Sequence, residues 1–175
     1  MTNNDIIGHH GYQVRAEAIQ SLGKCGPAAT KSLITISKNT SIWKTNAGDL
    51  LNAFGLTGDE KAVPILIQGM KDTDSEIRTS AVYAVTIRVS NYSAHTKGLI
   101  FSSLTTLITD ESFRVRQSVA ESFGKLGDIR AISYLEKLIN DKYNSVYQIT
   151  ENGVSREEKQ FAVRTAAQQA LEKLK

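Results

Sequence analysis

The chain has 175 residues, of which 41% are hydrophobic, 22% are charged and 7% are aromatic, and its net charge is +3. This composition is typical of a soluble globular domain, and the slight charge gives no reason to expect a nucleic-acid or membrane partner. A single cysteine excludes an internal disulfide framework and favours a reducing compartment, so we expect a cytoplasmic protein. No apolar run approaches about 18 residues, and the first residues have no basic end followed by an apolar stretch, so we expect neither a transmembrane helix nor a secretory signal.

Two prolines and many alanine- and leucine-rich stretches favour helices over a sandwich or barrel. After Lys142 the predicted helices are interrupted by a loop that ends near Ser155. The capping-box sequence Ser155-Arg156-Glu157-Glu158 then predicts the start of the last helix. In chain order, the helices expected before that loop cover about 12–24, 27–38, 42–54 with one further turn, 60–71, 75–89, 94–108, 111–126 and 129–141.

Five of these helices carry one repeated pattern. An apolar residue at position 0 is followed by a basic residue at +1, a small or aliphatic residue at +4 and a large apolar residue at +8, starting at Val14, Trp43, Ile77, Val115 and Val163. At about 100° per residue these apolar positions share one side of a helix, so each copy is predicted to bury one stripe. The endings Gly23-Lys24-Cys25-Gly26 and Gly124-Lys125-Leu126-Gly127 are expected to stop their helices.

Between copies, the stretches 58–66 and 127–132 read Gly-Asp-x-x-Ala. Together with the Val-Arg-x-x-Val pattern of 115–119, they resemble the HEAT-like repeats of α-solenoids, in the short form shared with phycobilin lyase families. The resemblance implies an all-α fold, a right-handed α–α superhelix of HEAT/armadillo type with about 4.5 helix-pair repeats. We expect a single domain, 1–175, with approximate units 1–26, 27–58, 59–91, 92–127 and 128–175.

The resemblance places the second helix of each pair on the concave face, where such solenoids bind their partners. Positions +2, +3 and +6 of those helices are then expected to point outward, and they form a polar, mildly acidic strip without a basic residue, which argues against a nucleic-acid groove. Tyr83 is either an interface anchor or a tyrosine exposed without a function. The partner-binding candidates are Glu17, Gln20, Asn46, Asp49, Thr79, Tyr83, Gln117, Glu121 and Gln169.

The basic +1 residues are interpreted as a structural ladder. In HEAT-like repeats this residue pairs with acids in turns, and Asp72, Asp74 and Asp110 are placed for that role. Cys25 is expected to be a buried apolar thiol and Trp43 a core residue, because both occupy apolar positions of the pattern. The ladder residues are Arg15, Lys44, Arg78, Arg116 and Arg164.

Function is predicted from the fold class, because no catalytic motif is present. Adjacent His9 and His10 point apart on a helix, and His95 has no Cys or His near it in sequence, so no metal or cofactor is expected. The favoured hypothesis is a non-enzymatic scaffold or adaptor for a protein partner. A phycobilin lyase-like, chromophore-handling subunit and a HEAT-like DNA glycosylase are the alternatives. Self-association through the N-terminal half-repeat is a further hypothesis.

Overall fold

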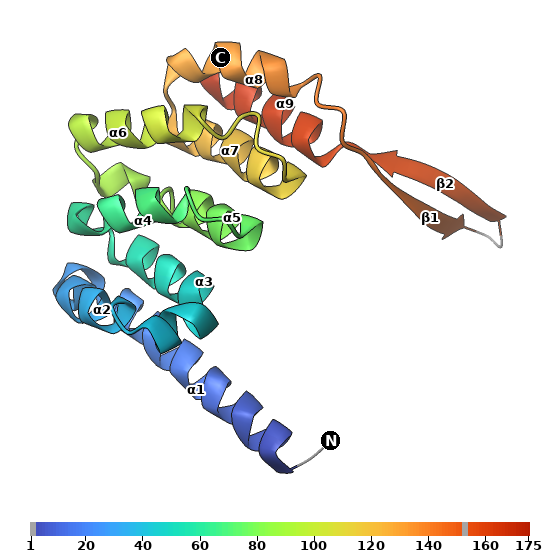
Figure 1. Cartoon of the computed structure of the whole chain (residues 1–175). Helices are drawn as coiled ribbons and strands as arrows, with labels where there is room; N and C mark the ends of the chain where they lie inside the picture. Colours follow the sequence, from blue (N-terminus) through green and yellow to red (C-terminus); the bar gives the residue numbers. More distant parts are fainter. Residues whose placement is uncertain (1–2, 152–153) are drawn as a thin grey trace. The chain divides into compact units, whose positions relative to one another are not determined.

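The structure, a computed structural model, describes residues 3–151 and 154–175. The all-α, solenoid-like fold predicted from the sequence is confirmed, with one β-hairpin inserted before the last helix (Figure 1). No helix of the described residues is both long and apolar enough to cross a membrane. The elements are α1 (Asn3–Lys24), α2 (Thr30–Ser37), α3 (Thr40–Thr57), α4 (Val63–Gly69), α5 (Ser75–Ala84), α6 (Ala94–Thr105), α7 (Phe113–Leu126), α8 (Ile132–Leu138), β1 (Ser145–Glu151), β2 (Val154–Gln160) and α9 (Ala162–Leu174).

Side chains of Asn39 and Asp59 cap the starts of two helical segments. Asn39 Oδ1 accepts hydrogen bonds from the backbone N–H groups of Ser41 and Ile42, at 3.0 and 3.2 Å. Asp59 accepts in the same way from the N–H of Lys61 at 3.0 Å, at the start of the 3-10 turn Glu60–Ala62 that leads into α4. These bonds satisfy N–H groups that the first helical turn leaves without partners.

The glycines of the repeat have two different roles, which corrects the prediction that both glycines of each ending stop the helix. Gly127 takes the left-handed conformation, with φ of 72°, and ends α7. Gly124 lies inside α7, where an added Cβ would lie 3.1 Å from Ala170 Cα of α9. Gly23 likewise lies inside α1, and a Cβ there would lie 2.7 Å from Ala53 Cα of α3. The inner glycine therefore allows two helices to approach closely.

The chain divides into two compact units, Met1–Ser103 and Leu104–Lys175, and the boundary between them falls inside α6. In the first unit α3 lies between α1 and α5, while α2 and α4 pack along it. Its core holds large side chains with no exposed surface: Leu33, Leu50, Leu51, Phe54, Leu66, Val82 and Val85. The single-domain organisation expected from the chain length stays a prediction.

In the second unit α9 packs against α7 and α8. The ring of Phe123 lies at the centre of this packing, fully buried, and stacks on Tyr134 with centroids 5.9 Å apart. Val115, Val119, Val163 and Ala167 are also fully buried, so the copy that starts at Val115 buries its predicted apolar stripe, and the last copy does so except at Leu171, which is half-buried.

The first copy buries a different stripe. Val14 is 66% exposed and Ala18 is exposed, whereas Ile19 is 4% exposed and Gly23 is buried. The prediction that Val14 and Ala18 are core residues is wrong, because α1 buries Ile19 and Gly23 instead, and Gly23 lies against Ala53 of α3. The helix itself is also longer than the predicted 12–24, since α1 begins at Asn3.

The predicted loop over 142–155 is also wrong, as is the helix start at Ser155. Residues 145–151 and 154–160 form an antiparallel hairpin in which Thr150 pairs with Ser155 and Gln148 pairs with Glu157. The stretch Val-Tyr-Gln-Ile-Thr is rich in β-branched and aromatic residues, which favour a strand. Asn152-Gly153 between the strands is the typical pair of a two-residue hairpin, and this signal outweighs the local capping box.

Candidate functional site

A polar cluster joins α1 to α3 in the first unit. Asp49 Oδ2 accepts hydrogen bonds from the Tyr12 hydroxyl and from Asn46 Nδ2, each at 3.2 Å. The Asp49 carboxylate raises the pKa of Tyr12 by disfavouring the phenolate, and burial and the hydrogen bond act in the same direction. Tyr12 remains 41% exposed, so the cluster carries an aromatic ring at the surface.

Asn46 lies beneath this surface instead of on it. Its side chain is 1% exposed, its backbone leaves the helical region at φ −133° and ψ 24°, and it also accepts a hydrogen bond from Thr45 Oγ1 at 2.9 Å. The expectation that Asn46 points outward is therefore wrong. Its amide supports a kink in α3 and holds the carboxylate of Asp49 in place.

The same surface continues from α3 to α5. A Cβ added to Gly48 would lie 3.5 Å from Ser80 Oγ, so the two helices lie side by side at this level. Tyr83, one turn further along α5, is 50% exposed. Of the other predicted positions, Glu17 is exposed, while Gln20, Asp49 and Thr79 are half-buried.

The predicted positions of the second unit lie on α7 and α9. Gln117 Nε2 donates to Glu121 Oε1 at 3.0 Å. Glu121 and Gln169 line a shallow depression of about 210 Å³ between the two helices. Lys125 and Lys173 line it too, so this surface carries basic groups that the predicted strip lacks. The sequence pattern missed them because they occupy positions +10 of their copies, which were assigned to the helix ends.

The basic +1 residues differ in their environment. Arg116 is 15% exposed and binds both carboxylate oxygens of Asp141, at 2.6 and 3.0 Å, while its other nitrogen donates to the Asp110 carbonyl at 2.7 Å. Arg78, 7% exposed, donates to the carbonyls of Asp72 and Thr73, at 2.9 Å each. Each of these arginines therefore hydrogen-bonds to the backbone of the turn that precedes its own helix, α7 for Arg116 and α5 for Arg78.

Asp141 connects two members of this set. Its backbone carbonyl accepts a hydrogen bond from Arg164 Nε at 2.6 Å, in addition to the Arg116 pair at its carboxylate. Burial raises the pKa of the Asp141 carboxyl, but the bonds from Arg116 and from the Tyr143 N–H outweigh burial and leave the pKa below its ordinary value. Arg15 and Lys44, by contrast, are exposed.

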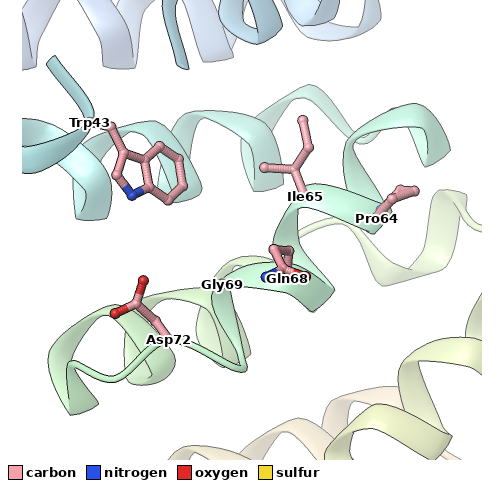
Figure 2. Close-up of a pocket in the computed structure, with 6 residues that line it drawn as sticks. All are labelled: Trp43, Pro64, Ile65, Gln68, Gly69 and Asp72. Carbon is pink, nitrogen blue, oxygen red and sulfur yellow. The ribbon is translucent and has the colours of Figure 1, made fainter. Parts of the chain in front are cut away.

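A hollow of about 430 Å³ lies between the start of α3 and α4. Figure 2 shows the Trp43 indole on one side, the side chains of Ile65 and Pro64 on the other, and Gln68 and Asp72 along the edge. Trp43 is half-buried, and its indole N–H has no hydrogen-bond acceptor among the described residues. The prediction that Trp43 is a packed core residue holds for only part of the ring.

Cys25 is exposed, and its thiol donates to the Ser21 carbonyl at 3.4 Å, so the expectation of a buried thiol is wrong. The short turn Gly26–Ala29 begins directly after it and carries the chain away from the helix. Within residues 3–151 and 154–175, no three His, Cys, Asp or Glu side chains come together as a metal site. The side chains of His9 and His10 lie outside the described residues.

The comparisons with known proteins support the repeat. Residues 115–141 match the model of the PBS lyase HEAT-like repeat. The fold is similar to the crystal structure of an engineered protein from the Northeast Structural Genomics Consortium, with 17% sequence identity and a TM-score of 0.58. The similarity covers 93% of this chain and 74% of the engineered chain. A second engineered protein is similar with 17% sequence identity and a TM-score of 0.55, over 91% of this chain and 43% of the engineered chain.

No curated protein matches the sequence. At 17% identity the engineered structures bear on the fold and not on function. The matched stretch contains all of α7 except its first two residues, together with the Arg116–Asp141 pair and α8. Residues 115–141 are therefore similar to a PBS lyase HEAT-like repeat, and they lie within a solenoid-like fold of helices.

Proposed function

We propose that the chain is a non-enzymatic scaffold or adaptor that binds a protein partner through its second helices. One observation carries the proposal. In the first unit α3 packs between α1 and α5, and the two outer helices each carry an exposed tyrosine, Tyr12 on α1 and Tyr83 on α5. Tyrosines give large contact areas together with a hydrogen-bonding group, and they are enriched at protein interfaces.

The charge of this surface indicates the kind of partner. Asp49 lies between Tyr12 and α5, Glu17 is exposed on α1, and no lysine or arginine is among the predicted contact positions of this unit. A partner segment with Lys, Arg or hydrogen-bond donors therefore complements it. The single cysteine favours a reducing compartment, and cytoplasmic residence is part of the proposal.

Affinity capture from the native cell, followed by mass spectrometry, tests the proposal. We expect Tyr83→Ala and Asp49→Lys each to lose a specific partner that the unaltered chain retains. Lys38→Ala, at an exposed position after α2, is the matched control and should retain it. A partner kept by both surface variants would show that binding uses another face, and circular dichroism of each variant would exclude unfolding as the cause of a loss.

A further inference from the structure

The β-hairpin of the second unit has two free edges. β1 and β2 are hydrogen-bonded to each other, and no third strand joins them within the described residues. Figure 1 shows the hairpin extending away from α7, α8 and α9 of the same unit. Of the apolar side chains in β1, Val146 is 51% exposed. A two-stranded hairpin alone is at best marginally stable in water, so a partner strand is physically favoured.

The two strands differ sharply in charge. β2 reads Val-Ser-Arg-Glu-Glu-Lys-Gln and carries four consecutive charged residues, whereas β1 reads Ser-Val-Tyr-Gln-Ile-Thr-Glu and has its only charge at its end. Charged residues protect a strand edge from pairing with another chain, and β1 lacks that protection. The residues of β1 are also those that strands favour. The available edge is therefore that of β1.

The sequence of β1 is complementary to itself. When two copies run antiparallel with Gln148 at the two-fold axis, Gln148 meets Gln148, Tyr147 meets Ile149 and Val146 meets Thr150. Aromatic–β-branched pairs of this kind stabilise sheets, and no like charges face each other. The equivalent arrangement of β2, centred on Glu157, would place two carboxylates opposite each other.

We propose that the edge of β1 is a homodimerisation site, at which two copies of this chain join their hairpins into one four-stranded antiparallel sheet. A two-fold arrangement of this kind uses the same surface on both subunits and closes on itself. Main-chain hydrogen bonds between the two β1 strands supply the affinity, as in other cases of strand addition. The site is independent of the tyrosine surface of the first unit.

Substitution of Gln148 by a charged residue tests this arrangement. Gln148 pairs with Glu157 inside the hairpin, so Gln148→Lys adds a favourable pair there and places two lysines opposite each other across the dimer axis. We expect analytical ultracentrifugation to show a concentration-dependent dimer for the unaltered chain. Gln148→Lys should weaken dimerisation by about fivefold, and a mixture of Gln148→Lys with Gln148→Glu should restore dimers.

Cross-linking gives the second measurement. In a Cys25→Ser background, Gln148→Cys should form a disulfide-linked dimer on mild oxidation, since directly opposed residues of antiparallel strands lie within disulfide reach. Glu157→Cys, on the protected strand, is the matched control and should remain monomeric on a denaturing gel. A chain that is monomeric at all concentrations would overturn the proposal. So would a dimer that Gln148→Lys leaves unchanged and Gln148→Cys does not cross-link, because that dimer forms elsewhere.

Discussion

Helices α7 and α1 carry the same repeat pattern and bury it differently. In α7 the residue at position 0, Val115, has no exposed surface, and the arginine after it binds Asp141. In α1 the corresponding Val14 is 66% exposed and Arg15 is exposed. Both stretches form helices, so the difference lies in the neighbours that cover them.

The neighbours explain the contrast. α7 packs against α8 and α9, its stripe of Val115, Val119 and Phe123 has no exposed surface, and Phe123 stacks on Tyr134 of α8. α1 buries Ile19 and Gly23, one position further around the helix than the pattern predicts, and Gly23 lies against Ala53 of α3. A periodic pattern therefore indicates a helix with an apolar side, while the packing partner decides which residues are covered.

The largest predicted effect breaks the arginine pair of α7. Arg116→Met should destabilise the chain by about 3 kcal/mol at neutral pH, because it leaves the mostly buried Asp141 carboxylate without its partner. Arg15→Met, at the matched position of α1, should change stability by less than about 0.5 kcal/mol. Urea denaturation followed by circular dichroism measures both, and equal shifts would contradict the contrast.

The same pair gives a pH dependence. Because the pKa of Asp141 is depressed in the folded chain, its stabilising contribution is complete above the unfolded-state pKa of about 4 and is lost as the pH falls through the folded value. The difference in stability between the unaltered chain and Arg116→Met should therefore narrow below about pH 4. A difference that stays constant into the acid range would show that the Arg116–Asp141 interaction contributes nothing.

The second prediction applies one substitution to both helices. Val115→Ala should cost about 2 kcal/mol, since it removes buried methyl groups and leaves a small cavity. Val14→Ala should change the free energy of unfolding by less than about 0.5 kcal/mol, because Val14 is already 66% exposed. Thermal and urea unfolding measure the two changes. A loss of stability from Val14→Ala as large as that from Val115→Ala would show that Val14 is a core residue, as the repeat pattern predicts.

The third prediction concerns the close approach of α1 to α3. Gly23→Ala should destabilise the chain by about 1–2 kcal/mol, because the added methyl group would lie 2.7 Å from the Ala53 backbone. Gly98→Ala in α6 is the control, since its added methyl group meets no atom within 4 Å. That variant should gain up to about 1 kcal/mol from helix propensity. Gains at both positions would show that α1 and α3 are not tightly apposed.

The smallest effect is the titration of Tyr12. Asp49→Asn should lower the pKa of the Tyr12 hydroxyl, because the carboxylate that disfavours the phenolate is removed. Nuclear magnetic resonance with labelled tyrosine separates this residue from the other five. A titration curve of Tyr12 that Asp49→Asn leaves unchanged would show that Tyr12 does not contact Asp49, and that this hydrogen bond does not join α1 to α3.

Much of the helical framework could be predicted because its signals are local. Asn39 and Asp59 cap where the sequence indicates, and the +1 arginines of α5 and α7 bind turn carbonyls through geometry that one repeat contains. The hairpin was missed although Asn152-Gly153 and the strand-forming residues of β1 were visible. The capping box at Ser155 and the two-residue turn are both short signals that predict different structures, and the pairing of the two strands decides between them.

The candidate surface was less accessible to prediction. Tyr83 was identified from the repeat, but Tyr12 precedes its copy and enters the surface only through its hydrogen bond to Asp49. Asn46 occupies an outward position of an ideal helix, and a kink at that residue turns it inward. Hydrogen bonds between helices and departures from helical geometry depend on residues far apart in sequence, which a periodic pattern does not contain.

The sequence by itself determined the helical repeat class, the positions of most helices and their caps, since these follow from propensity, capping and period. The tertiary structure decided which stripe of α1 is buried, that Gly23 and Gly124 serve contact instead of termination, and that 145–160 pairs as strands. The physical reason is that burial and strand pairing each involve two segments. The free energy of either one depends on the segment that packs or pairs with it, and a local sequence pattern does not contain that second segment.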